Sequence, residues 1–334
     1  MPTFLPLRAF GKTPLRVTPL CIGCAPLGSM PEAFAYDVAE EQALGTLRAC
    51  FQSPINLLDT AASYGDGESE RRIGIVLREL GGVPSGYLIA TKADRDLKTG
   101  DFSGTQIKRS VERSLRLLGV DKLPIVFLHD PEHARFEDIM AKGGATEALV
   151  KLKEQGVIGH VGMAGGPVDL MLRYIETGFF EALITHNRYT LLNRSAEPLI
   201  EKAAQMGLAV LNAAPYGSGI LAKGADAYPR YAYQAADAVI LERVRKLEAI
   251  CKRHKIPLAA AALQFSTRDP RITSTIIGLS RVERLAETVE LAHTPIPPEV
   301  WPLLDAVGFA QDDPEANRWN LRGVHVSSSR EKND

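Results

Sequence analysis

Residues 55–64 read INLLDTAASY, a short apolar run that ends in an aspartate and opens into a polar loop. Two runs downstream have the same form: YLIATK at 87–92 ends in a lysine, and PIVFLH at 124–129 ends in a histidine. Their apolar residues are continuous rather than alternating, which is typical of strands buried on both faces of a parallel sheet. The three runs therefore predict parallel strands whose ends carry ionisable side chains.

Five further apolar runs bring the number of expected strands to eight. They are LCIGC at 20–24, HVGM at 160–163, ALITHN at 182–187, LAVLNA at 208–213 and STIIG at 274–278. Amphipathic segments with helical spacing lie between the runs. We expect helices over 40–52, 69–80, 105–119, 144–155, 168–177, 195–206, 239–254 and 281–292.

This alternation in a chain of 334 residues predicts a (β/α)8 TIM barrel, whose right-handed crossovers make closure of the sheet natural. The alternative is an open doubly wound sheet, which normally places G-x-G-x-x-G after its first strand. Here the first strand leads into CAPLGSM at 24–30, which lacks that pattern. The barrel is therefore the preferred interpretation.

Other segments fall outside the repeat. Residues 4–18 contain two short runs split by GKT and predict a hairpin that plugs the bottom of the barrel. Residues 214–238 form a long segment rich in Gly, Tyr and Ala, more typical of a functional lid than of a connector. Residues 293–308 predict an extra terminal helix. We expect one barrel domain over 1–322 and a polar tail over 323–334.

Two expected helices begin with a capping-box pattern, in which Ser or Thr is followed three residues later by Glu or Gln. The pairs are Ser103 with Gln106 and Ser280 with Glu283. Ser280 is therefore expected to open the last barrel helix, whose N-terminus favours an anion.

Composition excludes several classes of protein. The chain carries 39 Lys and Arg against 40 Asp and Glu, so it lacks the basic surplus of a general nucleic-acid binder. No apolar run reaches the roughly 18 residues that cross a bilayer, and no secretory signal is evident. Four cysteines are too few for a disulfide framework, and Cys21 and Cys24 lie in an apolar strand. We expect a reduced, cytoplasmic protein that binds no nucleic acid, membrane or metal.

Reactive residues of such barrels come from the C-terminal ends of the strands. The second strand ends at Asp59 and leads to Tyr64, the third ends at Lys92 and the fourth at His129. Each alone has an ordinary structural interpretation. A lysine buried at a strand end must find an anion, however, and Asp59 lies on the neighbouring strand end. We therefore predict that Asp59, Tyr64, Lys92 and His129 form one catalytic site.

The electrostatics of this set predicts proton transfer at an oxygen atom. A phenol with a pKa of about 10 exchanges protons poorly near neutrality, and a nearby ammonium lowers that pKa. Asp59 would hold the ammonium in place. Tyr64 could then protonate or deprotonate a carbonyl or alcohol oxygen that His129 positions. The accompanying hydride transfer at carbon requires a nicotinamide cofactor.

The pattern D-T-A-x-x-Y-G at 59–65, with lysine after the third strand and histidine after the fourth, resembles the aldo-keto reductase family. The resemblance covers about residues 5 to 310. It implies that Tyr64 is the acid/base, that Lys92 and Asp59 tune it, and that His129 orients a small-molecule substrate. It also implies extended NAD(P)(H) binding across the barrel mouth without a Rossmann fold.

The resemblance also implies cofactor contacts from the later strand ends. Asn187 is expected to bind the nicotinamide amide, and the small residues after the seventh strand would follow the pyrophosphate with backbone N–H groups. The predicted cofactor set is Asn187, Tyr216, Gly217, Ser218, Gly219, Leu221, Gly278, Ser280 and Arg284.

Several positions depart from the family's pattern. Ala164 and Gly165 stand where the family usually has Ser-Asn beside the nicotinamide amide. Ala213 stands at the position of the aromatic residue that stacks on the ring, and the nearby Tyr216 is a candidate substitute.

The end of the eighth strand bears on the choice between NAD and NADP. Gly278 and Leu279 stand where NADP-preferring members place Lys-Ser, so a charge partner for the 2′-phosphate is missing. Arg284 matches a position that often contacts the adenosine end, so NADP stays an alternative. The sequence favours NAD.

Three stretches are similar to the aldose 1-dehydrogenase branch of the family, which includes L-fucose or D-threo-aldose dehydrogenases and pyridoxal 4-dehydrogenases. They are CAPLG at 24–28, NRYTLL at 187–192 and NAAPYGSGIL at 212–221. This similarity implies NAD(P)-dependent oxidation of the anomeric hydroxyl of an aldose to a lactone. The alternatives are a pyridoxal 4-dehydrogenase, a general aldehyde or ketone reductase, and a cofactor-binding redox-sensor subunit with little turnover.

Overall fold

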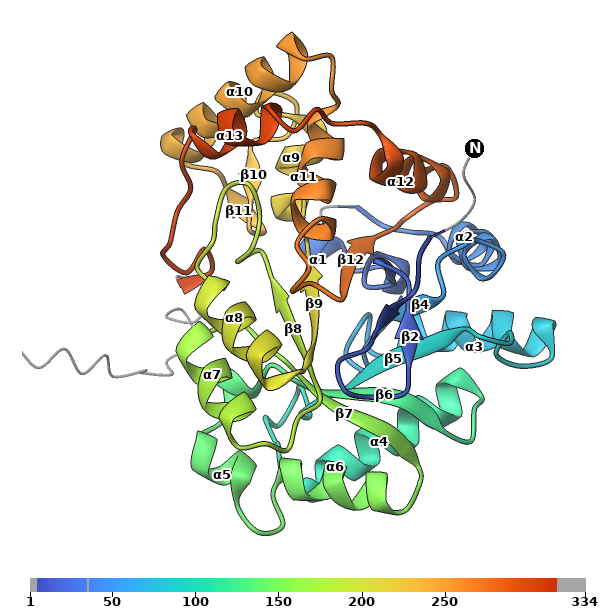
Figure 1. The fold of residues 1–334 in the computed structure, drawn as a ribbon. Helices are drawn as coiled ribbons and strands as arrows, with labels where there is room; N and C mark the ends of the chain where they lie inside the picture. The colour runs from blue at the N-terminus through green and yellow to red at the C-terminus, as the bar shows by residue number, and fades with distance from the viewer. Residues whose placement is uncertain (1–4, 35, 317–334) are drawn as a thin grey trace, which may run out of the picture.

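A closed parallel β-barrel forms the centre of the molecule (Figure 1). The computed structural model describes residues 5–34 and 36–316, so the expected tail at 323–334 lies outside the described residues. Neighbouring strands follow the order β12-β3-β4-β5-β6-β7-β8-β9. They are β3 (Leu20–Gly23), β4 (Leu57–Asp59), β5 (Leu88–Ala93), β6 (Leu123–His129), β7 (Ile158–Ala164), β8 (Ala182–His186), β9 (Ala209–Ala213) and β12 (Ser274–Gly278). Each coincides with one of the apolar runs, so the predicted TIM barrel is confirmed.

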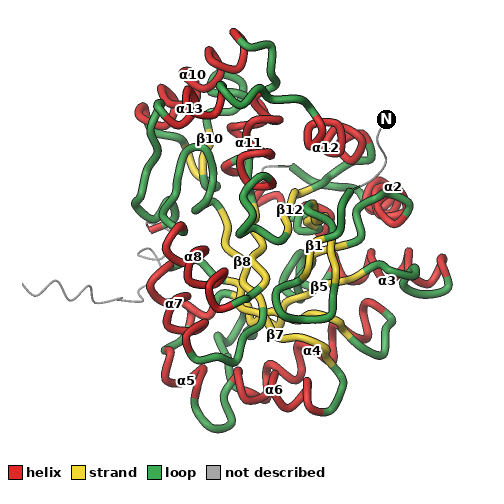
Figure 2. Tube along the Cα trace, viewed as in Figure 1, coloured by secondary structure: helices red, strands yellow, loops and turns green. Residues whose placement is uncertain are grey.

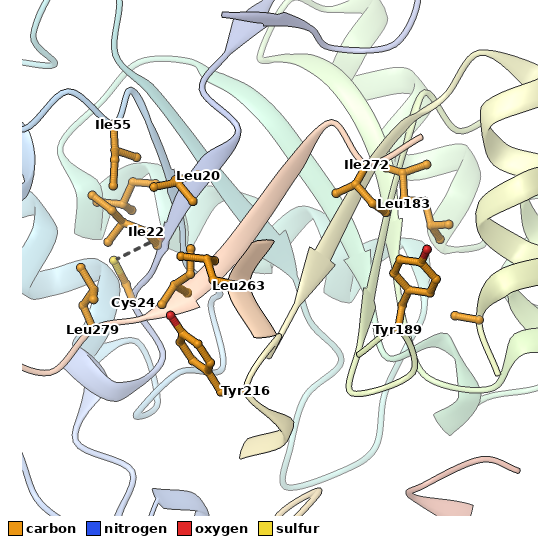
Figure 3. Packing of buried hydrophobic residues seen from close by; sticks show 14 of the residues in the cluster. Leu20, Ile22, Cys24, Ile55, Leu183, Tyr189, Tyr216, Leu263, Ile272 and Leu279 are labelled. Atoms are coloured by element: carbon orange, nitrogen blue, oxygen red, sulfur yellow. Dashed lines mark hydrogen bonds between the residues drawn. The ribbon is translucent and has the colours of Figure 1, made fainter. Parts of the chain in front are cut away.

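The strands are apolar throughout because both of their faces are buried. Cys21 packs inside the barrel with residues such as Leu57 and Phe127. Its neighbours Leu20 and Ile22 belong to the outer cluster between the strands and the helices (Figure 3). Successive strand residues point to opposite faces, and here each face meets apolar partners.

A hairpin closes the bottom of the barrel, as predicted. β1 (Arg8–Ala9) pairs with β2 (Arg16–Val17) in antiparallel fashion. Phe10 and Val17 are fully buried and belong to the cluster inside the barrel. The backbone N–H of Lys12 donates to the carbonyl of Gly207, which precedes β9.

Helices surround the barrel, and each expected helix is present (Figure 2). They are α2 (Glu40–Phe51), α3 (Glu68–Leu80), α4 (Gly104–Leu118), α6 (Ala145–Glu154), α7 (Val168–Glu176), α8 (Glu197–Met206), α10 (Ala238–Arg253) and α12 (Glu283–His293). A further barrel helix, α11 (Leu258–Thr267), was not expected from the sequence. Its residues 260–263 are all buried, so it lacks the polar face that makes a helix recognisable by its periodicity.

The two predicted helix caps have different outcomes. The Ser103 hydroxyl accepts a hydrogen bond from the Gln106 N–H at 3.3 Å and caps α4, as predicted. The prediction that Ser280 opens the last barrel helix is wrong, because α12 begins at Glu283 and Val282 occupies its N-cap. Ser280 is fixed otherwise: its carbonyl accepts a hydrogen bond from the Gln42 side chain at 2.7 Å.

The segments outside the barrel repeat contain further short helices and strands. The segment 214–238 is not a bare loop, because it contains η3 (Gly217–Gly219), α9 (Ile220–Lys223) and a hairpin of β10 (Arg230–Tyr231) and β11 (Gln234–Ala235). The predicted terminal helix is α13 (Val300–Asp305). The remaining short helices are η1 (Pro26–Gly28), α1 (Pro31–Phe34), η2 (Pro131–His133) and α5 (Phe136–Met140).

Candidate active site

Lys92 in β5 lies at the centre of the site, at the C-terminal end of the barrel, and its side chain is 3% exposed. Its Nζ lies 2.7 Å from Oδ2 of Asp59, the last residue of β4, and 3.0 Å from the Tyr64 hydroxyl oxygen. It also donates to the Thr60 carbonyl at 2.8 Å. The buried ammonium thus has its anion on the adjacent strand, and the structure brings Asp59, Tyr64 and Lys92 together.

The loop 61–66 carries Tyr64 back over Lys92. The N–H of Ala62 donates to the Lys92 carbonyl at 3.2 Å and ties this loop to β5. Gly65 has a φ of 60°, and a Cβ there would lie 2.0 Å from the Gly28 carbonyl oxygen. Only glycine fits this position, which explains the glycine that follows the tyrosine.

The electrostatics of the pair differs in one respect from expectation. Burial raises the pKa of Tyr64 above its ordinary value, and the attraction of Lys92 only partly opposes this effect. Burial opposes the charge on Lys92, but Asp59 and Tyr64 outweigh it, so the pKa of Lys92 is raised. The site therefore holds an ammonium beside a protonated phenol. Lys92 lowers the pKa of Tyr64 as expected, but burial outweighs this effect.

His129, at the end of β6, faces Tyr64 with a distance of 5.9 Å between the ring centroids. Its Nδ1 lies 2.7 Å from Oδ1 of Asp94, and its Nε2 lies 3.5 Å from Oδ1 of Asp130. Burial works against a charged imidazole, but the carboxylates of Asp130 and Asp94 prevail and raise the pKa of His129. Sequence reasoning missed both carboxylates, although Asp94 follows Lys92 by two residues and Asp130 follows His129 directly.

These residues line one deep cavity of about 1060 Å³. Asp59, Tyr64, Lys92 and His129 all contribute to its wall. The wall near them is polar, with contributions from Ser63, Asp94, Arg95, Asp130 and His186. Aromatic side chains line another part of it, namely Phe34, Tyr36, Tyr228 and Tyr233.

The predicted cofactor residues fall into two groups. Tyr216, Ser218, Gly219, Gly278, Ser280 and Arg284 line the cavity. Asn187, Gly217 and Leu221 are buried behind its wall.

Tyr216 and Asn187 each contact other parts of the chain. The Tyr216 ring packs in the apolar cluster with Leu263 and Leu279, and among the described residues its hydroxyl meets no hydrogen-bond partner (Figure 3). The Asn187 amide donates to Oε1 of Glu315 at 2.9 Å. Tyr216 thus both packs in the core and lines the cavity, and the Asn187 amide is held by the C-terminal segment.

Glu315 is fully buried, and sequence reasoning did not find it. His186 Nε2 lies 3.0 Å from its Oε1, and Arg188 Nη1 lies 3.4 Å from the same atom. Burial alone would raise the pKa of Glu315, but His186 and Arg188 lower it well below the ordinary range. Because Glu315 lies 128 residues from Asn187 and in no expected element, no local pattern could indicate this contact.

The loop after β7 explains why a glycine replaces the family's usual polar residue. A Cβ on Gly165 would lie 2.8 Å from Sδ of Met171 and 2.9 Å from Oε2 of Glu132. Those side chains occupy the volume that a larger residue would need. Gly165 therefore presents only backbone to the cavity.

Part of the cavity wall has the features that would hold a dinucleotide. Gly219 and Gly278 line its wall, and a Cβ on Gly278 would approach Pro26 to 3.3 Å, so bare backbone faces the space. Arg281 and Arg284 also line it and supply positive charge for phosphate groups. These four residues would hold the phosphates and the adenosine.

Other kinds of site are not found in the described part of the chain. Residues 5–34 and 36–316 contain no group of three or more His, Cys, Asp or Glu side chains that could hold a metal ion. Within the same ranges, no helix has the length and apolar character needed to cross a membrane.

Comparison with known proteins agrees with this geometry. The chain is 30% identical to L-galactose dehydrogenase of Arabidopsis thaliana over 290 residues, covering 86% of this chain and 88% of the relative. It is 28% identical to D-threo-aldose 1-dehydrogenase of a Pseudomonas species, covering 86% and 93%. It is 29% identical to pyridoxal 4-dehydrogenase of Microbacterium luteolum, covering 90% and 97%.

A solved structure has the same fold. The holo form of an aldo-keto reductase from Bacillus halodurans superposes with a TM-score of 0.76 at 22% identity, covering 94% of this chain and 99% of that chain. A model of the Aldo/keto reductase family matches residues 19–308. The chain therefore belongs to the aldo/keto reductase family and is an NAD(P)-dependent oxidoreductase.

Proposed function

We propose that the protein oxidises the anomeric hydroxyl of an aldose to a lactone, with Tyr64 as the acid/base. The main support for this proposal is that Lys92 Nζ lies within 3.0 Å of both the Asp59 carboxylate and the Tyr64 hydroxyl oxygen. Two of the relatives named above are dehydrogenases of sugars. Their similarity supports the choice of an aldose.

The polarity of the cavity near Tyr64 also supports a polyhydroxylated substrate. Asp130, Arg95 and His186 line this part of the wall. A carboxylate accepts hydrogen bonds from hydroxyl groups and a guanidinium donates to them, whereas an aryl aldehyde offers fewer hydroxyl groups to either.

In the proposed reaction, Tyr64 takes the proton of the anomeric hydroxyl. A nicotinamide dinucleotide, when bound, accepts the hydride from the anomeric carbon. Lys92 donates to the developing phenolate and stabilises it, while Asp59 keeps the ammonium charged and fixed. His129 donates to the substrate oxygen and orients it. In the reverse direction the protonated phenol returns its proton to the carbonyl oxygen.

For the cofactor we propose a preference for NAD. The support is the absence of a lysine side chain at Gly278 and Leu279, the positions where NADP-preferring members of the family carry Lys-Ser. Arg284 is already engaged, because its Nε lies 3.4 Å from Glu287 Oε2. Titration of the protein with NADH and NADPH, followed by nucleotide fluorescence, would reject this preference if NADPH bound tenfold more tightly.

The function is tested by turnover of L-fucose, D-arabinose, L-galactose and pyridoxal, each with NAD+ and NADP+. We expect lactone formation from at least one aldose at a higher kcat/KM than oxidation of pyridoxal. Faster pyridoxal oxidation would indicate a pyridoxal 4-dehydrogenase. Faster NADPH-dependent reduction of simple aldehydes would indicate a reductase, and cofactor binding without turnover would indicate a sensor.

Tyr64→Phe tests the acid/base role in the same assay. We expect kcat to fall by about 10²-fold or more while cofactor binding is retained, because general acid–base catalysis contributes at least that factor. Tyr87→Phe is the matched control, since it removes a buried hydroxyl beside Phe51 and outside the cavity. Near-normal turnover in Tyr64→Phe would contradict the proposal.

A further inference from the structure

Asp94 uses both of its carboxylate oxygens to join two parts of the site. Oδ1 lies 2.7 Å from Nδ1 of His129, at the end of β6. Oδ2 accepts the backbone N–H of Ser63 at 2.9 Å, and Ser63 directly precedes Tyr64 in the loop after β4. The side chain of Asp94, the residue that follows β5, thus bridges the two elements that carry His129 and Tyr64.

Two side chains of α4 hold the backbone of Asp94 by hydrogen bonds. Its N–H donates to the Ser110 hydroxyl at 3.0 Å, and its carbonyl accepts from the Gln106 side chain at 3.3 Å. Both partners lie on α4. The side chain is only 6% exposed, so water cannot easily replace its two contacts. These backbone contacts and the burial of the side chain leave the carboxylate little freedom to rotate.

We propose that Asp94 is a positioning residue that fixes the ring of His129 and the loop of Tyr64 relative to each other. The proposal rests on the proposed roles of His129 and Tyr64. With Nδ1–H bound to Asp94, Nε2 is the ring nitrogen left to face a substrate oxygen, and it donates to that oxygen when the imidazole carries its second proton. Through its bond to the Ser63 N–H, the same carboxylate also fixes the position of the loop that carries the Tyr64 hydroxyl. A shift of Asp94 would therefore misplace both groups at once.

Asp94 also affects the pKa of His129, as do the other charged groups around the ring. The charged or titratable groups around the ring are Asp94 and Lys92 of the β5 segment, Asp59 of β4, Tyr64, and the adjacent Asp130. Asp130 and Asp94 raise the pKa of His129, whereas Lys92 lowers it. Asp94 makes the shorter contact, at 2.7 Å against 3.5 Å for Asp130.

Asparagine cannot reproduce this arrangement. Two N–H donors, from Ser63 and His129, converge on the two oxygens of Asp94. An amide offers one acceptor oxygen and turns its NH2 group toward the second donor. Asp94→Asn therefore keeps the size of the side chain while it removes the charge and one of the two acceptors for these N–H groups.

The test follows the Cε1 signals of the seven histidines by NMR as the pH is varied in the apo protein, with the His129 signal assigned by its loss in His129→Gln. In Asp94→Asn we expect the pKa of His129 to fall by about one unit or more, the usual effect of losing an adjacent carboxylate. We expect kcat/KM for the best substrate of the panel to fall by about tenfold to a hundredfold with unchanged NADH affinity.

Asp121→Asn is the matched control, because it removes an exposed carboxylate before β6. An unchanged His129 titration in Asp94→Asn, relative to this control, would overturn the proposal. Should Asp94→Asn fail to fold, Asp94→Glu keeps the charge but displaces it. We expect that variant to retain a raised pKa of His129 and to lose turnover, and full activity would overturn the positioning role.

The NMR titration needs no substrate, so its outcome is independent of the proposed function. Loss of turnover in Tyr64→Phe together with an unchanged His129 titration in Asp94→Asn would reject the role of Asp94 alone. A shifted titration with undiminished turnover in Tyr64→Phe would reject the proposed function alone.

Discussion

Lys92 shows how one buried residue sets the protonation of a site. Its ammonium is satisfied by Asp59, by the Thr60 carbonyl and by the Tyr64 hydroxyl. Burial holds the phenol in its protonated form, and the attraction of Lys92 is the main force that favours the phenolate. In the proposed reaction, oxidation needs the phenolate of Tyr64, whereas reduction needs the phenol. The two directions should therefore respond oppositely to pH.

We predict that the oxidation rate rises from about pH 7 to about pH 10, whereas the reduction rate does not. In Lys92→Met the pKa of Tyr64 should rise further, because the one strong opposing charge is lost and burial remains. The increase of the oxidation rate with pH should then occur at higher pH. At a given pH, kcat for oxidation should fall by about 10²-fold or more. The measurement is the pH dependence of kcat in both directions.

The control for Lys92→Met is the double variant with Asp59→Asn, which avoids leaving a buried carboxylate without its cation. If the pH dependence of kcat for oxidation were unchanged in both variants, the role assigned to Lys92 would be contradicted.

At this scale the sequence predicted the residues that stand at strand ends and missed those that support them. Asp59, Lys92 and His129 could be found because the end of an apolar run is visible in the sequence. Asp94 is equally near a strand end, but its role depends on which side chains the barrel brings within reach. Glu315 depends on a contact with residues 186–188, far away in the chain.

Among the elements, the packing of α3 on α4 depends on a single missing side chain. A Cβ on Gly74 of α3 would lie 1.9 Å from the Leu117 carbonyl oxygen of α4. Gly45 in the middle of α2 is different, because a Cβ there would meet no atom within 4 Å among the described residues. The two positions are therefore a matched pair that separates helix propensity from packing.

We predict that Gly74→Ala lowers the free energy of unfolding by about 1–3 kcal/mol, the usual cost of overpacking. Gly45→Ala should raise it by about 0.5–1 kcal/mol, because alanine favours the helix. Urea unfolding of both variants provides the measurement. A similar change in both would show that the contact between α3 and α4 is not the cause.

Prediction of the helices was reliable where one face is buried and the other is exposed, and it failed where the helix is buried on nearly every side. The strands could be identified because they are short, continuous apolar runs, and most helices because their apolar residues recur with a helical period. α11 has buried residues on nearly every side, so its period is absent. The pattern of Ser280 and Glu283 matched a cap, but the chain stays outside the helix until Glu283.

On the scale of the whole molecule, the C-terminal segment fastens the loop that follows β8. Ala310 forms a bridge with Asn193. Glu315 and Asp313 pair with Arg188, whose side chain is fully buried. Removing Glu315 would leave a buried guanidinium and a histidine at the cavity wall without their shared anion, and such a loss is costly.

We predict that Glu315→Gln lowers the free energy of unfolding at neutral pH by about 3–5 kcal/mol. The folded state lowers the pKa of Glu315, so its stabilising effect is present above the unfolded value of about 4.3 and is lost as the pH falls toward the lower folded value. The variant should therefore lose part of the acid sensitivity of the wild type below about pH 5.

Denaturant unfolding at several pH values measures both effects. Asp313→Asn is the control, since that side chain is 27% exposed and its loss should cost less. Equal stability losses at all pH values would contradict the role assigned to Glu315.

The way in which the barrel closes affects the order in which the chain can fold as it is made. β12 pairs with β3 on one side, Thr275 opposite Leu20, and with β9 on the other, Ile276 opposite Ala213. A nascent chain that has not yet released residues 274–278 from the ribosome must leave β3 and β9 as open sheet edges, which invite pairing between chains. Translation that stalls before this last strand should therefore yield an aggregation-prone intermediate, and chaperone dependence should end once it emerges.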